Sequence, residues 1–340
     1  MAKNVSMEDL ADKLGISKNT VSLALRGMPG ISNQTRELIL KTAREMGYEY
    51  KGTLKSSTGA LSKNICLVIP KSTYESQGFF SFIQLGIEDE AKRNQFNTIL
   101  HYYNENEKDF QAPLSVKAGM VSGIITLGRV SSSTICRILE LGLPTVMVDH
   151  YFDDRSLDYI ISDSKSGGYR ATMHLIENGH KEIGFIGNIK ASISFYDRYE
   201  GYLKALQCSG LPVNSSHILA DESFEELNFI DPALALKALK SLPKLPTAFF
   251  CCNDAEAINL YKALSSAGLS VPGDISVIGF DNIDWAKNIS PELTTLHVDK
   301  ELMGRKAVQR LISLLDTPSE APEKCIVSVE LISRNSVRKV

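Results

Sequence analysis

The stretch from Val5 to Tyr48 constrains the fold more than any other, because it carries three sets of helix start and stop signals. Each of its three apolar-periodic runs is preceded by a small polar residue and followed by a glycine, which are the usual signals for a helix start and a helix end. The flanking pairs are Ser6 with Gly15, Ser17 with Gly27, and Ser32 with Gly47. The sequence therefore predicts three short helices.

Only Gly15-Ile16-Ser17 separates the first two predicted helices. This spacing is typical of a helix-turn-helix, whose second helix enters the DNA major groove. At the start of that helix, Asn19 can form hydrogen bonds with adenine and Lys18 with guanine, while Ser and Thr can bind either a base or a phosphate. A capped three-helix bundle that never touches DNA has the same pattern, so the spacing alone leaves both interpretations open.

The order of short motifs in this stretch is more specific than a lone helix-turn-helix. It resembles the headpiece of the lactose- and galactose-repressor family of bacterial transcription regulators. The motifs are Val5-Ser6-Met7-Glu8-Asp9-Leu10-Ala11, Gly15-Ile16-Ser17, Thr20-Val21-Ser22, Ile31-Ser32 through Thr35-Arg36, and Gly47-Tyr48. The DNA-contact candidates in this part are Ser6, Ser17, Lys18, Asn19, Thr20, Ser22, Arg26, Asn33 and Thr35.

Charge is distributed unevenly along the 340 residues. Residues 1–58 hold nine Lys/Arg and six Asp/Glu, which gives a net charge of +3. Since the whole chain has a net charge of −3, residues 59–340 have a net charge of −6. A basic head on an acidic body suits a protein that meets phosphate with one end only. No run approaches the roughly 20 apolar residues of a membrane span. Six scattered cysteines without ligand spacing favour buried free thiols, no metal site and a cytoplasmic location.

Residues 50–63 form a linker by composition, rich in Ser, Thr, Gly and Lys. In the resembled family this segment forms a hinge helix on DNA, and a leucine wedges into the minor groove. Here the equivalent position is Ser57, and the nearest leucines are Leu54 and Leu61. The hinge contacts expected from the resemblance are Lys51, Leu54 and Lys55, with a plain flexible tether as the alternative.

After the linker, apolar strands alternate with amphipathic helices, which favours parallel sheets covered on both faces. The expected helices include 80–93 and 110–118, and one of the expected strands is 123–127. So many strands predict two doubly wound subdomains rather than one sheet, with a ligand between them. The fold class is thus an all-α helix-turn-helix headpiece plus an α/β core.

The core resembles the same family's effector domain, which has the periplasmic sugar-binding-protein fold. The resemblance rests on 179–187, on 271–281 followed by 291–295, and on the tail 331–336. It implies three chain crossovers, near 162–164, 290–293 and 322–324. The expected domains are 1–49, 50–63 and 64–340, the last divided into a first subdomain (about 64–162 and 293–322) and a second (about 163–290 and 324–340).

Polar residues directly after predicted strands are candidates for ligand contact, because parallel strand ends share one edge. Carboxylates, an amide and a guanidinium suit sugar hydroxyls, and aromatic rings suit a sugar face. By the resemblance, the effector-binding candidates are Phe79, Phe80, Asp149, Arg198, Phe224, Asn253 and Asp281. The structural alternatives are helix caps for Asp and Asn (Asp254 above all), core packing for Phe, and a salt bridge to Asp197 or Glu200 for Arg198.

No enzyme signature is present in the sequence. It lacks GxGxxG opening a helix, GxxxxGK[ST], HExxH and GxSxG. We therefore predict a homodimeric transcriptional repressor that binds double-stranded operator DNA and a small-molecule effector, with a sugar preferred, and needs no cofactor. A purine or other non-sugar effector is the alternative within the family, and a solute-binding receptor for transport is the alternative outside it.

Overall fold

The computed structural model describes residues 5–25, 31–46, 48, 62–75, 78–105, 110–220, 232–317 and 321–340. Contacts divide the chain into two units. The first comprises Met1–Asn64 with Ala112–Ser122, and the second comprises Ile65–Gln111 with Gly123–Val340. We describe each unit by itself.

Three helices make up most of the described part of the first unit: α1 (Met7–Leu14), α2 (Lys18–Leu25) and α3 (Asn33–Glu45). The predicted caps at Ser6, Ser17 and Ser32 and the helix end at Gly15 are confirmed, whereas Gly27 and Gly47 lie outside the described residues. The Ser6 hydroxyl accepts the Asp9 amide at 3.2 Å, while the Asp9 carboxylate accepts the Ser6 amide at 2.7 Å. Gly15 ends α1 with a left-handed φ of 63°. A small apolar core joins the helices through Leu10, Ala11, Val21, Ala24, Ile39 and Ala43.

The remaining helix of the first unit, α5 (Leu114–Lys117), is shorter than the sequence indicated. We expected a helix over 110–118, but Pro113 caps it in an extended conformation with φ −53° and ψ 141°. Proline also disfavours helical geometry at the residue before it. The helix therefore cannot begin before Leu114.

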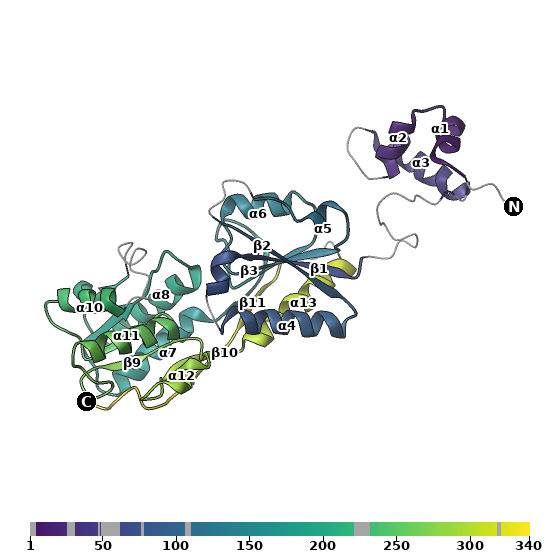
Figure 1. Ribbon diagram of the computed structural model, residues 1–340. Helices are drawn as coiled ribbons and strands as arrows, with labels where there is room; N and C mark the ends of the chain where they lie inside the picture. Colours follow the sequence, from purple (N-terminus) through teal and green to yellow (C-terminus); the bar gives the residue numbers. More distant parts are fainter. Residues whose placement is uncertain are drawn as a thin grey trace. The chain divides into compact units, whose positions relative to one another are not determined.

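The second unit contains a six-stranded sheet with strand order β11-β5-β4-β3-β1-β2. Its strands are β1 (Asn64–Pro70), β2 (Asn97–Tyr103), β3 (Gly123–Leu127), β4 (Thr145–Val148), β5 (Asp158–Ser162) and β11 (Lys324–Val327). Figure 1 shows α4 (Phe80–Arg93) and α13 (Lys300–Asp316) along one face of this sheet and α6 (Ser132–Leu139) along the other. We call this sheet with these helices the first lobe.

A four-stranded sheet of order β7-β6-β8-β9 and an antiparallel pair, β10 with β12, form the second lobe. The strands are β6 (Ile183–Ile186), β7 (Ile218–Leu219), β8 (Ala248–Cys251), β9 (Ser276–Ile278), β10 (Thr295–Val298) and β12 (Val329–Ile332). The helices are α7 (Ser164–Glu177), α8 (Ile193–Cys208), α10 (Pro232–Ser241), α11 (Asp254–Ser266) and α12 (Trp285–Asn288). The predicted headpiece with two parallel α/β subdomains is thus confirmed.

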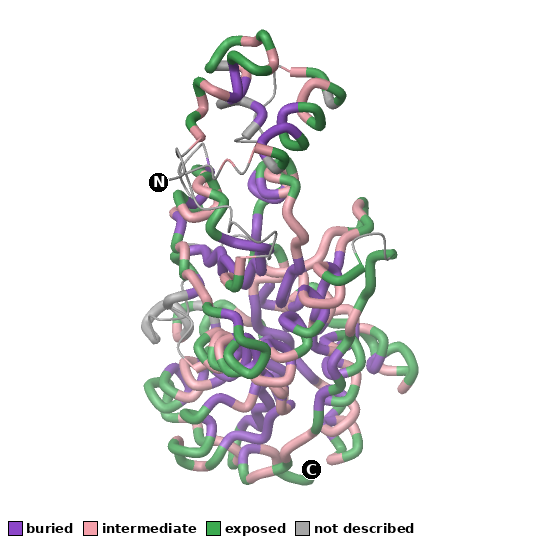
Figure 2. The backbone as a smooth tube through the Cα atoms, turned by 90° about the vertical axis from the view of Figure 1, so that its right-hand side faces the viewer, coloured by how far each residue is buried: buried purple, intermediate pink, exposed green. Residues whose placement is uncertain are grey.

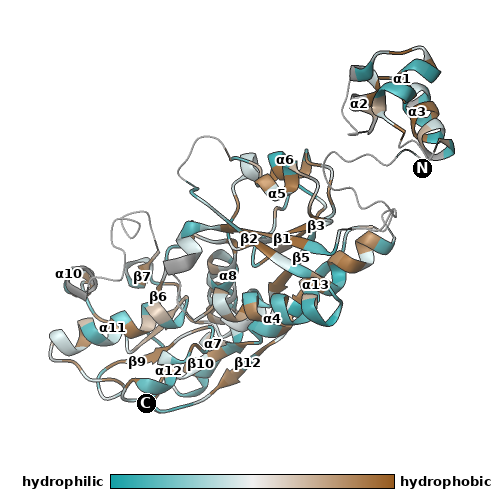
Figure 3. Cartoon of the chain, turned by 45° about the vertical axis from the view of Figure 1, so that its right-hand side comes forward, coloured by the Kyte–Doolittle hydropathy of each residue, from teal (hydrophilic) through white to brown (hydrophobic). Residues whose placement is uncertain are grey.

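Side-chain alternation explains why helices cover both faces of the second sheet. Phe250 of β8 packs with α7 and α8, whereas its neighbour Phe249 packs with α10 and α11. Both rings are fully buried, and burial of one such side chain contributes about 2–3 kcal/mol. In Figure 2 the buried segments lie in the interior and the exposed ones outside, and in Figure 3 the strands are largely hydrophobic while the helices carry hydrophilic stretches.

The chain crosses between the lobes three times. It leaves β5 for α7 at Asp163, leaves β10 for α13 at Asp299, and leaves β11 for β12 at Ser328. The last two crossings lie a few residues later than expected. We placed residues from 324 in the second subdomain, but β11 pairs with β5 of the first sheet. Strand pairing decides this assignment, and apolar periodicity does not reveal it.

Candidate functional site

The side chains predicted to contact DNA are largely engaged in local caps. The Ser17 and Thr20 hydroxyls lie 2.7 Å apart, as do those of Ser32 and Thr35. Lys18 forms an exposed ion pair with Glu8 at 3.1 Å. Local capping fixes the start of α2 and α3, so the backbone that would face a duplex is well defined. Asn19, Ser22 and Asn33 lie in helices, whereas Arg26, Lys51, Leu54 and Lys55 are outside the described residues.

Three of the predicted effector residues meet between the two lobes of the second unit. Asp149 follows β4, Asp281 follows β9, and Arg198 lies in α8. We call these three residues the interlobe cluster. Arg198 Nη2 lies 3.0 Å from Asp281 Oδ1, and Arg198 is 1% exposed. Arg198 also perturbs the pKa of Asp149 electrostatically, as does Asp281.

The guanidinium of Arg198 has contacts on all sides within the second lobe. Nη1 donates to the Cys252 carbonyl at 2.7 Å, and the plane lies 3.7 Å from the centroid of the Phe280 ring. The alternative pairing with Asp197 or Glu200 is therefore wrong. A stacked, ion-paired arginine has a fixed orientation, which suits a group that positions a ligand.

A close helix contact determines where Arg198 sits. A Cβ atom on Gly168 of α7 would lie 2.2 Å from the Arg198 carbonyl oxygen, and one on Gly201 of α8 would lie 2.2 Å from the Lys165 carbonyl oxygen. The two helices thus touch backbone to backbone, which only glycine permits. Their contact brings the guanidinium to the ends of the second sheet.

Asp149 has a carboxylate oxygen, Oδ1, that is buried and has no hydrogen-bond partner among the described residues. Burial raises the pKa of Asp149 to about 7, Arg198 opposes this effect, and Asp281 reinforces it. Burial also raises the pKa of Asp281, against Arg198 and Lys300. Such shifts at converging carboxyl groups are typical of functional sites.

His150, the residue after Asp149, is buried as well. Its Nδ1 has no hydrogen-bond partner in the described part of the chain, and its ring packs edge-on against Phe152 at 4.9 Å. Burial, with Arg129 as the second cause, lowers the pKa of His150 to about 4. The imidazole is therefore neutral near pH 7. Asp149 and His150 therefore each place a buried polar atom without a hydrogen-bond partner among the described residues directly after β4, whereas most buried polar atoms of native proteins are satisfied.

The residue that caps α11 is Asn253, not Asp254 as expected. Asn253 caps α11, since its Oδ1 accepts the Glu256 amide at 2.8 Å. Asp254, expected to be the cap, is fully buried and accepts the Ile283 amide at 2.9 Å and the Thr295 hydroxyl at 2.5 Å. Asp254 therefore supports the segment after β9, and Asn253 lies at the edge where β8 ends.

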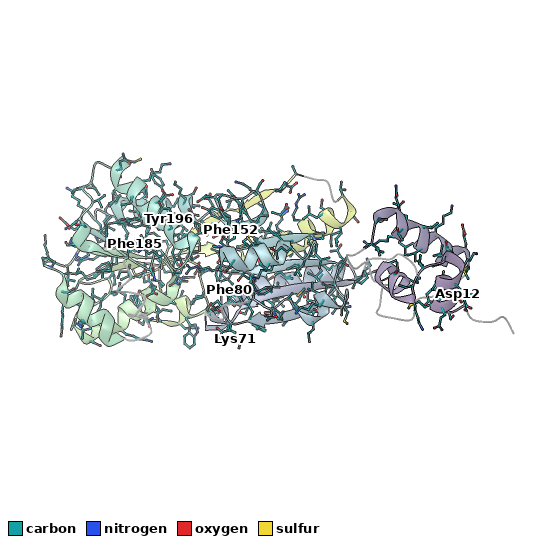
Figure 4. All side chains as sticks on the ribbon, turned by 90° about the horizontal axis from the view of Figure 1, so that it is seen from above. Asp12, Lys71, Phe80, Phe152, Phe185 and Tyr196 are labelled. Carbon is teal, nitrogen blue, oxygen red and sulfur yellow. The ribbon has the colours of Figure 1, made fainter. Side chains whose placement is uncertain are left out.

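Two of the three predicted aromatic residues, Phe79 and Phe80, lie in the described part of the chain. Phe79 and Phe80 precede and begin α4, and their rings meet edge-on at 5.1 Å. Phe79 is 7% exposed, so core packing accounts for most of its surface. Phe224 lies outside the described residues. In Figure 4, Phe80 and Phe152 mark the first lobe and Tyr196 marks the second lobe near their junction.

Two further contacts join the lobes, and the sequence did not suggest either. Tyr151 donates its phenolic hydrogen to Asp197 Oδ1 at 3.2 Å, and Arg129 Nη1 donates to the Ala191 carbonyl at 3.1 Å. Tyr151 and Asp197 lie within two residues of Asp149 and Arg198 in sequence, whereas Arg129 follows β3 and Ala191 precedes α8. The sequence offers only the position of Tyr151 and Arg129 after predicted strands as a sign of these contacts, because both residue types are common on protein surfaces.

Other kinds of site find no support in the described residues. No group of three or more His, Cys, Asp or Glu is arranged there to hold a metal ion. None of the helices in the described ranges is both long and apolar enough to cross a bilayer. All six cysteines are free thiols. His180 is a buried structural residue, whose Nδ1 and Nε2 lie 2.9 Å from Thr247 Oγ1 and 3.1 Å from the Arg338 carbonyl.

Comparison with known proteins agrees with this architecture. Residues 6–50 match the family described as bacterial regulatory proteins, lacI family, and residues 172–337 match a periplasmic binding protein-like domain. The chain is 30% identical to the ribose operon repressor of Haemophilus influenzae, over 98% of both chains. It is 32% identical to the HTH-type transcriptional repressor PurR of Actinobacillus pleuropneumoniae serotype 3, over 98% of this chain and 99% of the other.

Among solved structures, the lac repressor dimer bound to operator and the anti-inducer ONPF has the same fold. It superposes with a TM-score of 0.69 at 22% identity, over 99% of this chain and 100% of that one. The similarity to full-length repressors covers the head and both lobes together. The chain therefore belongs to the lacI family of bacterial transcriptional regulators: it is a DNA-binding repressor with a periplasmic-binding-protein-like effector domain, and not an enzyme.

Proposed function

We propose that this repressor is controlled by a neutral sugar that binds at the interlobe cluster. The unsatisfied Oδ1 of Asp149 carries the proposal, because a buried acceptor without a donor costs about 1–3 kcal/mol. A hydroxyl group supplies such a donor. Arg198 and Asp281 offer a donor and an acceptor beside it, and Asn253 lies at the adjacent strand end. The candidate rings for a sugar face are Phe79 and Phe80, with Phe224 as a further candidate from the sequence outside the described residues.

Charge favours a neutral ligand over an anion. Three carboxyl groups, those of Asp149, Asp254 and Asp281, are buried at or next to the cluster. Of the nearby cations, Arg198 is paired with Asp281, and the Lys300 ammonium donates to backbone carbonyls. An added phosphate or carboxylate would meet these buried acidic groups, while the described cations named here, and Arg129 beside His150, already have acceptors; burying such an anion is costly in a low-dielectric site.

We further propose that the chain acts as a homodimer that presents two α2 helices to the half-sites of an operator. The helix-turn-helix spacing and the polar start of α2 support this arrangement, as does the dimeric state of the similar lac repressor. The proposed contacts are Ser6, Ser17, Lys18, Asn19, Thr20, Ser22, Arg26, Asn33 and Thr35 in the head, and Lys51, Leu54 and Lys55 in the linker.

A thermal-shift and calorimetric screen of the full-length protein tests the effector. The panel includes D-ribose and cellobiose as neutral sugars, a sugar phosphate, a hexuronate, hypoxanthine and guanine. We expect a neutral sugar to raise the melting temperature, because it binds only the folded state. Binding of a purine but no sugar would replace this effector class by the one that the name of PurR suggests.

Operator binding is tested by selecting duplexes from a random library with the full-length chain and measuring Kd with and without the sugar. Asn19→Ala should lose base preference at its position, whereas Thr58→Ala in the linker serves as the matched control. A change of Kd with sugar would support control by the effector. Equal affinity for selected and random duplexes would contradict the proposed DNA contacts.

A further inference from the structure

Lys300 is a buried cation at the point where the chain passes from the second lobe into the first. It is the first residue of α13 and is 7% exposed. Its Nζ donates to the backbone carbonyls of Asp281 at 2.5 Å, Val298 at 3.2 Å and Asn282 at 3.5 Å. An ammonium group has three hydrogens, so these carbonyls use all of its donors. Lys300 therefore has no donor left for a ligand.

The turn that Lys300 holds has an unusual backbone. Asp281 and Asn282 have positive φ values of 104° and 52°, a region that residues other than glycine seldom occupy. Such a conformation costs about 1–3 kcal/mol per residue and persists only where surrounding contacts enforce it. Arg334 Nη2 donates to Asn282 Oδ1 at 2.7 Å, and Asp254 accepts the next amide, that of Ile283, at 2.9 Å.

This turn aims the Asp281 carboxyl group at Arg198. The carboxyl oxygen and the guanidinium are 3.0 Å apart, and the Asp281 carbonyl on the other side of the same residue accepts from Lys300. Lys300 holds the carbonyl of Asp281 and Arg198 holds its carboxyl group, so loss of Lys300 would remove one of the two contacts that fix this residue. The orientation of one effector candidate thus depends on a lysine that itself contacts no effector.

Lys300 is anchored to the first lobe through α13. A Cβ atom on Gly86 of α4 would lie 2.2 Å from the Glu301 carbonyl oxygen, and one on Gly304 of α13 would lie 2.2 Å from the Ile83 carbonyl oxygen. The start of α13 is therefore fixed against α4 backbone to backbone. The Lys300 ammonium also lies 5.9 Å from the centroid of the Phe79 ring.

We propose that Lys300 is a positioning residue, which ties the Asp281–Asn282 turn of the second lobe to helix α13 of the first lobe and so makes effector affinity depend on the lobe arrangement. The proposal rests on the effector site proposed above. Burial lowers the pKa of Lys300, and four acidic side chains oppose this effect: Asp281, Asp254, Asp284 and Asp299. A charged donor makes the stronger hydrogen bonds to the three carbonyls.

Hydrogen exchange of the full-length protein without effector tests the structural half. The variants are Lys300→Met, Lys300→Arg and, as a control, Lys306→Met at an exposed lysine of the same helix. We expect the amides of 281–285 to exchange at least tenfold faster in Lys300→Met, and unchanged in Lys306→Met. Exchange in Lys300→Met that matches wild type would overturn the proposal, whatever the effector is.

Titration with D-ribose by calorimetry tests the functional half. If wild type binds D-ribose, we expect Lys300→Met to weaken binding at least tenfold, Lys300→Arg to stay within threefold, and the operator Kd without ribose to change less than twofold in all variants. Equal ribose affinity in wild type and Lys300→Met would overturn the role of Lys300. If no sugar binds wild type, the proposed effector fails, and the exchange rates alone decide the role of Lys300.

Discussion

The two lobes each bring one buried cation to their junction, and they do so by the same means. Arg198 lies on α8, whose backbone touches Gly168 of α7, and Lys300 begins α13, whose backbone touches Gly86 of α4. The partners of the two cations differ. Arg198 faces a carboxylate at 3.0 Å, whereas Lys300 donates to backbone carbonyls.

This difference separates ligand contact from support. A carboxylate can exchange its arginine partner for a ligand hydroxyl with little backbone movement, because only side chains are involved. Carbonyl groups of a left-handed turn cannot release their lysine without a change of backbone conformation. We infer that Arg198 belongs to the effector surface, while Lys300 belongs to the frame that holds it.

The largest expected effect follows from disrupting the backbone contact in either lobe. Gly168→Val and Gly86→Val each place side-chain atoms where a carbonyl oxygen lies 2.2 Å from the ideal Cβ position. We expect each to lower the free energy of unfolding by at least about 3 kcal/mol. Urea unfolding followed by the fluorescence of Trp285, the single tryptophan, measures this. Ser166→Val, at an exposed site of α7, is the control; a loss below about 1 kcal/mol in the glycine variants would contradict the close contact.

The next largest effect should come from Arg198→Met, which leaves the buried Asp281 carboxyl group and the Cys252 carbonyl without their donor. We expect a loss of about 3 kcal/mol at pH 8, and a smaller loss at pH 5, where Asp281 takes up a proton more readily. Denaturation at both pH values gives the comparison, with the exposed Arg93→Met as the control. Equal losses at the two pH values would argue against an unpaired carboxylate.

Asp149→Asn should change how stability depends on pH. Burial raises the pKa of Asp149 in the folded state to about 7, well above the ordinary aspartate value of about 4. The folded state therefore holds a proton that the unfolded state releases, and this contribution to stability falls as pH rises from about 4 to about 7. Relative to wild type, the variant should gain about 2 kcal/mol between pH 5 and pH 7, since one pKa unit corresponds to about 1.4 kcal/mol. Parallel pH profiles for wild type and variant would refute this; Asp316→Asn, at an exposed aspartate, should give such a profile.

The smallest effect is expected for Tyr151→Phe, which removes one hydrogen bond between the lobes. Its partner Asp197 lies 3.2 Å away in a partly buried position, so the net loss of stability should stay below about 1 kcal/mol. Differential scanning calorimetry measures it against Tyr196→Phe, which alters an exposed tyrosine. A loss as large as that of Arg198→Met would show that the lobes depend on peripheral contacts more than on the buried cations.

Much of the fold was predictable because it depends on local signals. The Ser6–Asp9 capping box, the helix Phe80–Arg93 and the strand Gly123–Leu127 have the predicted residues. Backbone capping and apolar periodicity act over a few residues and are visible in the sequence. The helix expected over 110–118 was wrong at its start, because Pro113 disfavours helical geometry at the residue before it and the helix begins at Leu114.

The candidate site was predictable in its residue types and less so in their roles. Asp149, Arg198 and Asp281 do meet, but the capping role belongs to Asn253, and Asp254 supports the turn after β9. The sequence does not distinguish which of two adjacent polar residues at a strand end caps the next helix and which supports a neighbouring segment. Only the direction of each side chain in the fold distinguishes them.

The sequence by itself determined the helix caps, the alternation of strands and helices, and the kinds of side chain at the strand ends, because each depends on neighbours close along the chain. The tertiary structure alone decided that β11 joins the first sheet, that Arg198 pairs with Asp281, and that Lys300 holds the turn beside it. These contacts join residues far apart in the chain. Their geometry arises from strand pairing and helix packing, for which no local pattern exists.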